Sequence, residues 1–147
     1  MAIPDFDNDG LLPPGFHRAT RAEVEVRFGW NEHRRDLLAG LHVALDDLAQ
    51  AGCRRVFLDG SFVTEKEEPN DWDLVWDMSG VAVNYLHPVL RMLAPPRFQQ
   101  HARYRGDILP NVLEAGSGQP FVDFFQVDKD SMKPKGIIEM ELGVTNA

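Results

Sequence analysis

The chain has a single cysteine, Cys53, among its 147 residues. A single cysteine excludes an internal disulfide, which is typical of proteins of the reducing cytosol. Cys53 follows an apolar stretch with helical spacing, so we expect it to be a small residue of the core rather than a catalytic group.

Long apolar runs are also missing, and no stretch approaches the roughly 20 residues needed to span a bilayer. The segment Met1–Asp5 lacks the basic and apolar regions of a signal peptide. We therefore expect a cytoplasmic protein that does not associate with membranes.

Positive charge is scarce. Lys and Arg number 15 against 23 Asp and Glu, giving a formal net charge of −8. Such a surface repels a nucleic-acid backbone, so a polynucleotide partner is not expected unless a local basic patch exists. Arg103, Arg105, Lys133 and Lys135 could supply positive charge to a triphosphate or a polynucleotide, or could be solvated surface charges.

The length and composition predict one domain over residues 1–147, with 44% hydrophobic and 26% charged residues. Proline, glycine and acidic residues over 1–19 predict an extended lead-in without regular structure that lies against the body.

The pattern of the remaining chain alternates between helices and strands. A capping box at Thr20 and Glu23 predicts a short helix to about Phe28, and Asn31 is a plausible N-cap for a long helix that stops at Gly52. A third helix, interrupted or bent near Pro88, is expected over residues 81–93. Strands are expected at 56–58, from Asp71 to Gly80, near 104–109, at 111–113, at 121–127 and at 136–142. The fold class that follows is α/β, with a small mixed sheet of four to five strands and helices packed on one face.

The most informative stretch joins the first two of these strands. A strand at 56–58 runs into Gly60-Ser61, and the next strand opens with Asp71 and Asp73. Side chains alternate along a strand, so these two carboxylates point the same way. Two acids near a Gly-Ser turn indicate a divalent cation and a phosphate.

Asp123 is a candidate for a third carboxylate, since the strand expected around it is otherwise apolar or aromatic apart from Gln126. A charge in such a place is costly unless it is paired or binds a metal. Asp107 is its rival for the third position. Three converging carboxylates would suit Mg²⁺ and phosphoryl or nucleotidyl transfer.

These residues resemble the polymerase-β-like nucleotidyltransferase superfamily. Gly60-Ser61, followed ten residues later by Asp71-Trp72-Asp73-Leu74, is similar to its Gly-Ser…Asp-x-Asp signature, and the likeness covers roughly residues 31–127. The resemblance implies a nucleotidyltransferase fold, with NTP as substrate and Mg²⁺ or Mn²⁺ as cofactor. It implies nucleotide binding by Gly60 and Ser61, with Lys66 as the nearby cation. It also implies catalytic metal binding by Asp71, Asp73 and Asp123.

The function expected from the motif is transfer of a nucleoside monophosphate from an NTP to a hydroxyl of a protein or small molecule. The superfamily includes antitoxin-type members that modify a partner toxin, so a toxin–antitoxin or defence setting is one form of this function. The acceptor could come from a partner protein or from a second copy of the chain in a homodimer. Two alternatives stay open. The acidic loop around Glu65–Glu68 suits a catalytically silent protein-binding module, and Asp-x-Asp also serves metal-dependent phosphoesterases.

Overall fold

A computed structural model describes residues 3–112, 126–128 and 131–142. Its sheet has five strands in the order β1-β5-β2-β3-β4. The strands are β1 (Phe16–Arg18), β2 (Arg55–Asp59), β3 (Trp72–Trp76), β4 (Gly106–Pro110) and β5 (Ile137–Glu141). The outer pairs β1–β5 and β3–β4 are parallel, whereas β2 is antiparallel to both of its neighbours. The predicted mixed α/β architecture is confirmed.

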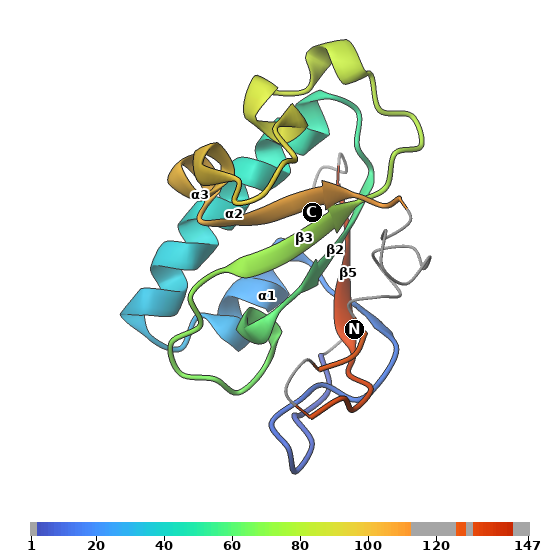
Figure 1. Cartoon of the computed structure of the whole chain (residues 1–147). Helices are drawn as coiled ribbons and strands as arrows, with labels where there is room; N and C mark the ends of the chain where they lie inside the picture. Colours follow the sequence, from blue (N-terminus) through green and yellow to red (C-terminus); the bar gives the residue numbers. More distant parts are fainter. Residues whose placement is uncertain (1–2, 113–125, 129–130, 143–147) are drawn as a thin grey trace.

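The helices α1 (Arg21–Phe28), α2 (Glu32–Gln50) and α3 (Phe98–Tyr104) pack on one side of this sheet, as Figure 1 shows. The sheet side chains that meet them form one apolar cluster with α1 and α2, and include Val56, Leu58, Trp72, Leu74 and Ile108. The intervening residues of the same strands point to the other face. That second face carries Phe57 and Val75 at its centre and aspartates at one end.

The two predicted helix starts are confirmed at the level of single hydrogen bonds. Glu23 N donates to Thr20 Oγ1 at 3.1 Å, and Thr20 N donates to the Glu23 carboxylate at 2.9 Å, which completes the capping box. Asn31 Oδ1 accepts from Arg34 N at 2.8 Å at the start of α2. These bonds satisfy amides that the first turn of a helix leaves without partners.

Cys53 is buried directly after α2, as expected. Burial raises the pKa of its thiol to about 11, so the thiol stays protonated at neutral pH. A protonated, enclosed sulfur is a poor nucleophile, in agreement with a packing role.

The helix predicted for residues 81–93 is wrong. Two short 3₁₀ turns, Val83–Tyr85 and Pro88–Arg91, occupy this region. Pro88 has no N–H and cannot continue an α-helix from the preceding residues. The helix α3 follows instead, between Arg97 and Arg105. These two residues have left-handed conformations, with φ values of 55° and 71°, and they mark the start and the end of the helix.

The lead-in is not wholly irregular, because it contains β1. The rest of the prediction for it is correct, since Leu11 and Leu12 are buried against the body. The second predicted strand ends at Trp76, well before Gly80. Asn111 and Val112 lie outside any strand. The strand predicted at 121–127 falls mainly outside the described residues.

Gly40 on α2 packs directly against the backbone at the C-terminal end of α3. A Cβ atom at this position would lie 1.9 Å from the carbonyl oxygen of Tyr104, which is backbone and cannot swing aside. Helix propensity alone makes Gly→Ala stabilising by about 1 kcal/mol. We expect Gly40→Ala instead to lower the free energy of unfolding by about 1–3 kcal/mol, as overpacking does.

Urea unfolding of Gly40→Ala measures this effect. The exposed neighbour Ala39 provides the control, because Ala39→Gly changes helix propensity without touching α3. A Gly40→Ala variant more stable than the natural chain would contradict the close packing of the two helices.

Candidate functional site

Three aspartates lie side by side across adjacent strands on the second face of the sheet. Asp59 on β2 is directly opposite Asp73 on β3, and Asp73 is directly opposite Asp107 on β4. Residues opposite each other in a sheet project to the same side with neighbouring Cβ atoms. Asp59, Asp73 and Asp107 are called the aspartate row below. Its formation brings together one residue of the predicted Asp-x-Asp pair and the predicted rival, Asp107.

Asp71 precedes β3 and joins the β4 end of this row. Ligand-type atoms of Asp71, His101 and Asp107 all lie within 4.8 Å of one another, and these residues come from three separate segments. The His101 Nε2 atom is 3.0 Å from Asp107 Oδ1 and 4.0 Å from Asp71 Oδ2. Among the residues that the structure describes, these three form the one group of His, Cys, Asp or Glu side chains close enough together to hold a metal ion, and they are called the metal-capable trio below.

The Gly60-Ser61 turn lies against Asp73, as its place in the motif predicts. Gly60 has φ of 90°, and a Cβ atom on it would lie 2.8 Å from Asp73 Oδ2 and 3.2 Å from Asp73 N. Ser61 opens the 3₁₀ turn Ser61–Val63, which is closed by a 3.2 Å bond from Val63 N to Gly60 O. Glycine is therefore required here both by the backbone conformation and by the space.

A cation is placed at each end of the aspartate row. Lys135 Nζ lies 3.2 Å from Asp59 Oδ1, and both side chains are almost fully buried. At the other end Arg97 Nη1 lies 3.3 Å from Asp107 Oδ1, on the same oxygen that His101 contacts. The two cations offset the repulsion expected between neighbouring carboxylates in a sheet.

The other basic residues considered from the sequence lie elsewhere. Arg103 bonds to Asp47, and this contact raises the pKa of its guanidinium. Lys133 pairs with Asp9 at 2.8 Å, which raises the pKa of its ammonium. Arg105 is exposed after α3. Of this predicted set, Lys135 is the member found at the aspartate row.

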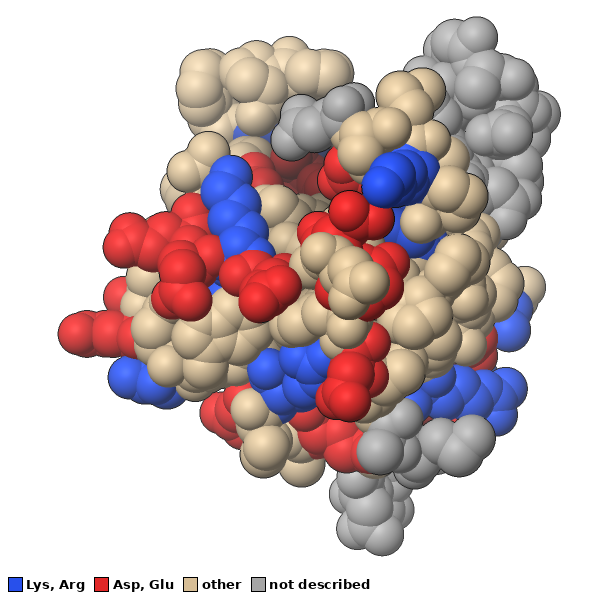
Figure 2. Space-filling model, turned by 90° about the horizontal axis from the view of Figure 1, so that it is seen from below, with Lys and Arg blue, Asp and Glu red and all other residues tan. Residues whose placement is uncertain are grey.

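Lys66 and Ser61 line a hollow of about 690 Å³, into which acidic residues also open. Its lining includes Asp9, Glu65 and Glu67. Figure 2 shows the molecule from below, where Lys and Arg side chains are interspersed with Asp and Glu rather than gathered in one broad patch. The described surface on this side thus offers no basic track for a polynucleotide.

Asp123 lies outside the described residues, so its role as third carboxylate stays a prediction. His101 and Arg97 are contacts of the site that sequence reasoning did not identify. The basic and aromatic composition of residues 97–107 is visible in the sequence, but it does not distinguish a helix from a strand. With a helix recognised at 98–104, the proximity of His101 to the following strand could have been inferred.

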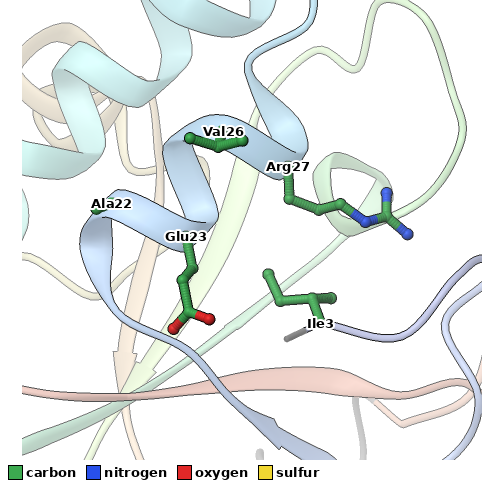
Figure 3. A pocket seen from close by; sticks show the side chains of 5 residues that line it. All are labelled: Ile3, Ala22, Glu23, Val26 and Arg27. Carbon is green, nitrogen blue, oxygen red and sulfur yellow. The ribbon is translucent and has the colours of Figure 1, made fainter. Parts of the chain in front are cut away.

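A second hollow, of about 470 Å³, lies along α1 and is drawn in Figure 3. Ile3, Ala22 and Val26 give it an apolar lining. Its polar side chains have structural partners, since Glu23 belongs to the capping box and Arg27 Nη2 donates to Pro4 O at 3.0 Å. This groove carries no cluster of reactive groups.

The fold and the site together define a small mixed α/β protein with an acidic site at one end of its sheet. The chain belongs to the family of unknown function DUF6932, whose model matches residues 4–141. No curated protein and no solved structure matches the chain. Within the described residues, no helix is long and apolar enough to cross a membrane.

Proposed function

We propose that this protein is a nucleotidyltransferase, dependent on Mg²⁺ or Mn²⁺, that moves a nucleoside monophosphate from an NTP to a hydroxyl acceptor. The observation that carries the proposal is the register of β2, β3 and β4. This register aligns Asp73 with Asp107 and leaves the Gly60-Ser61 turn in contact with the Asp73 carboxylate.

The donor set fits a divalent cation. Asp71 and Asp107 supply carboxylate oxygens, which Mg²⁺ prefers, and the imidazole of His101 is also acceptable to Mn²⁺. Asp73 projects from the middle of the same row. We propose Asp71, Asp73 and Asp107 as the metal-binding carboxylates, with Asp107 in the third position that the sequence resemblance assigns to Asp123. A bound cation would neutralise phosphate charge and activate the attacking hydroxyl.

The chain's own groups have distinct roles in this proposal. Gly60 allows the backbone to approach a phosphate, and Ser61 offers its amide and hydroxyl as donors. Lys66 opens into the same hollow as Ser61 and adds positive charge there. Arg97, which pairs with Asp107, would supply a guanidinium that can bind a phosphate oxygen. In this proposal Asp107 would accept the proton of the acceptor hydroxyl.

The acceptor belongs to a protein or a small molecule, and either a partner chain or a second copy of this chain could present it. An antitoxin-like reaction on a partner protein is the form of this function that the sequence resemblance suggests. Nucleic acid is a less suitable acceptor, given the net charge of −8.

Incubation with each of four labelled NTPs and Mg²⁺ or Mn²⁺ tests the proposal. We expect metal-dependent nucleotide binding and label transfer to the chain or to an added acceptor. Asp73→Ala should weaken nucleotide binding at least tenfold, about 1.4 kcal/mol. The exposed helix residue Glu25 gives a control, since Glu25→Ala should leave binding unchanged.

One observation favours the second candidate function, a catalytically silent protein-binding module. Arg97 holds Asp107 in an ion pair, which competes with metal ligation. No nucleotide binding by the natural chain, with any NTP or metal, would support the module and reject the transferase. Release of nucleotide product without an acceptor would instead indicate a phosphoesterase.

A further inference from the structure

Arg34 is a fully buried arginine on the first turn of α2, and every one of its N–H groups is used. Its Nε donates to Lys66 O at 3.1 Å, and Nη2 donates to Lys66 O and, at 2.9 Å, to Thr64 O. Its Nη1 donates to Phe62 O at 2.7 Å and to Phe28 O at 3.2 Å. The planar fork of one guanidinium thus holds the backbone carbonyls of four residues.

Within the described residues Arg34 forms no ion pair with a carboxylate. Burial lowers the pKa of its guanidinium to about 10, so it stays protonated at neutral pH. Its charge is stabilised by the carbonyl dipoles and by the ring of Trp30, whose centroid lies 3.6 Å from the guanidinium carbon. The Glu67 carboxylate acts in the same direction, because its negative charge raises the pKa of the guanidinium. Burying a guanidinium is costly even so, which is unusual for a residue that only fixes an ordinary loop.

Three of the four residues held by Arg34 belong to the connection 62–70, which joins the Gly60-Ser61 turn to Asp71. Other residues at the start of α2 hold the remainder of this connection. Asn31 Nδ2 donates to Glu67 O at 2.8 Å, and His33 Nε2 lies 2.5 Å from Pro69 O. The connection is therefore anchored along its length from one helix terminus.

We propose that Arg34 is a positioning residue that fixes the Gly60-Ser61 turn and Asp71 relative to each other. This inference rests on the proposed function, in which one metal-bound nucleotide contacts both ends of the connection. Arg34 touches neither the nucleotide nor the metal. Its effect comes from the geometry of the backbone between them, where a displacement of about 1 Å can cost 100-fold in rate.

The decisive variant is Arg34→Lys, which keeps the charge but has three donors and no planar fork. Arg35, the next residue of α2, gives a matched control. It is exposed, and its Nη1 donates to Gly29 O at 3.2 Å. We expect Arg34→Lys to lower kcat/KM for the preferred NTP about 100-fold, and Arg35→Lys to change it less than twofold. Hydrogen exchange of the amides in residues 61–71 should be faster in Arg34→Lys than in the natural chain, and should be unchanged in Arg35→Lys.

Asn31→Ser provides a second route if Arg34→Lys does not fold. Serine preserves the N-cap acceptor, but it lacks the Nδ2 donor to Glu67 O. We expect a roughly tenfold loss of kcat/KM in this variant with an almost unchanged urea midpoint.

A purely structural role for Arg34 would lower the urea midpoint but leave the kinetic constants of the folded protein unchanged. That result overturns the positioning role. If Arg34→Lys does not fold, an Asn31→Ser variant with the same kcat/KM as the natural chain overturns it instead. If the natural chain neither binds nor transfers any NTP, the proposed function fails and this inference fails with it. An active natural chain with an equally active, folded Arg34→Lys variant rejects the inference alone.

Discussion

Replacing Asp107 with asparagine is expected to reduce nucleotidyl transfer by about 100- to 1,000-fold, the range found when one preorganised transition-state group is lost. Asparagine keeps the size of the side chain, but it removes the negative charge and the proton acceptor. Asp107 lies directly opposite Asp73 and within the metal-capable trio, so its carboxylate contributes both to metal binding and to the proposed activation of the hydroxyl. Single-turnover rates with saturating NTP and Mg²⁺ provide the measurement.

Asp123→Asn is the matched variant, because the sequence leaves Asp107 and Asp123 as rivals for the third position. We expect Asp123→Asn to retain most of the activity. If Asp123→Asn is inactive and Asp107→Asn is active, the third carboxylate is Asp123 and our assignment is wrong. Metal affinity, followed by Mn²⁺ titration of both variants, distinguishes loss of the cation from loss of the base.

Replacing Lys135 with methionine is expected to lower the free energy of unfolding by about 3–5 kcal/mol, because it removes the buried cation that lies 3.2 Å from the Asp59 carboxylate. The two side chains are 8% and 3% exposed, so water cannot solvate the carboxylate that remains. Asp59 is also directly opposite Asp73, which adds repulsion when Lys135 is absent.

Lys133→Met gives a control for the loss of a lysine at the same end of the chain. Lys133 pairs with Asp9 at 2.8 Å, but both side chains are at least half exposed. Surface ion pairs of this kind contribute about 0–1 kcal/mol. Urea unfolding at neutral pH compares the two variants. Equal effects of Lys133→Met and Lys135→Met would show that the Lys135–Asp59 contact has no special importance for the fold.

Local signals in the sequence predict several parts of the structure. Thr20 and Glu23 predict the start of α1, and Asn31 predicts the start of α2, because a cap bonds to amides only a few residues away. The alternation around Asp73 correctly separates the helix-covered face from the aspartate face. The contact between the Gly60-Ser61 turn and Asp73 also follows from a short chain segment.

Contacts between distant residues were not accessible in the same way. The partner of β1 is β5, more than a hundred residues further along, and no local pattern specifies that pairing. His101 reaches Asp107 through a helix whose ends depend on left-handed conformations at Arg97 and Arg105, two residues that do not favour them. The buried pair Lys135–Asp59 likewise depends on the register between β2 and β5.

The sheet order β1-β5-β2 has a consequence for how the protein is made. The strand β5 lies between β1 and β2, although it is the last strand described along the chain. A ribosome synthesises the chain from its N-terminus at about 5–20 residues per second, so β1 and the edge of β2 that faces β5 lack their partner until β5 has been made. The hairpin-like pair β2–β3 can form early, whereas the middle of the sheet closes last. Until β5 arrives, the exposed edge of β2 is open to pairing with other chains, and it is the place where aggregation of the nascent protein would begin.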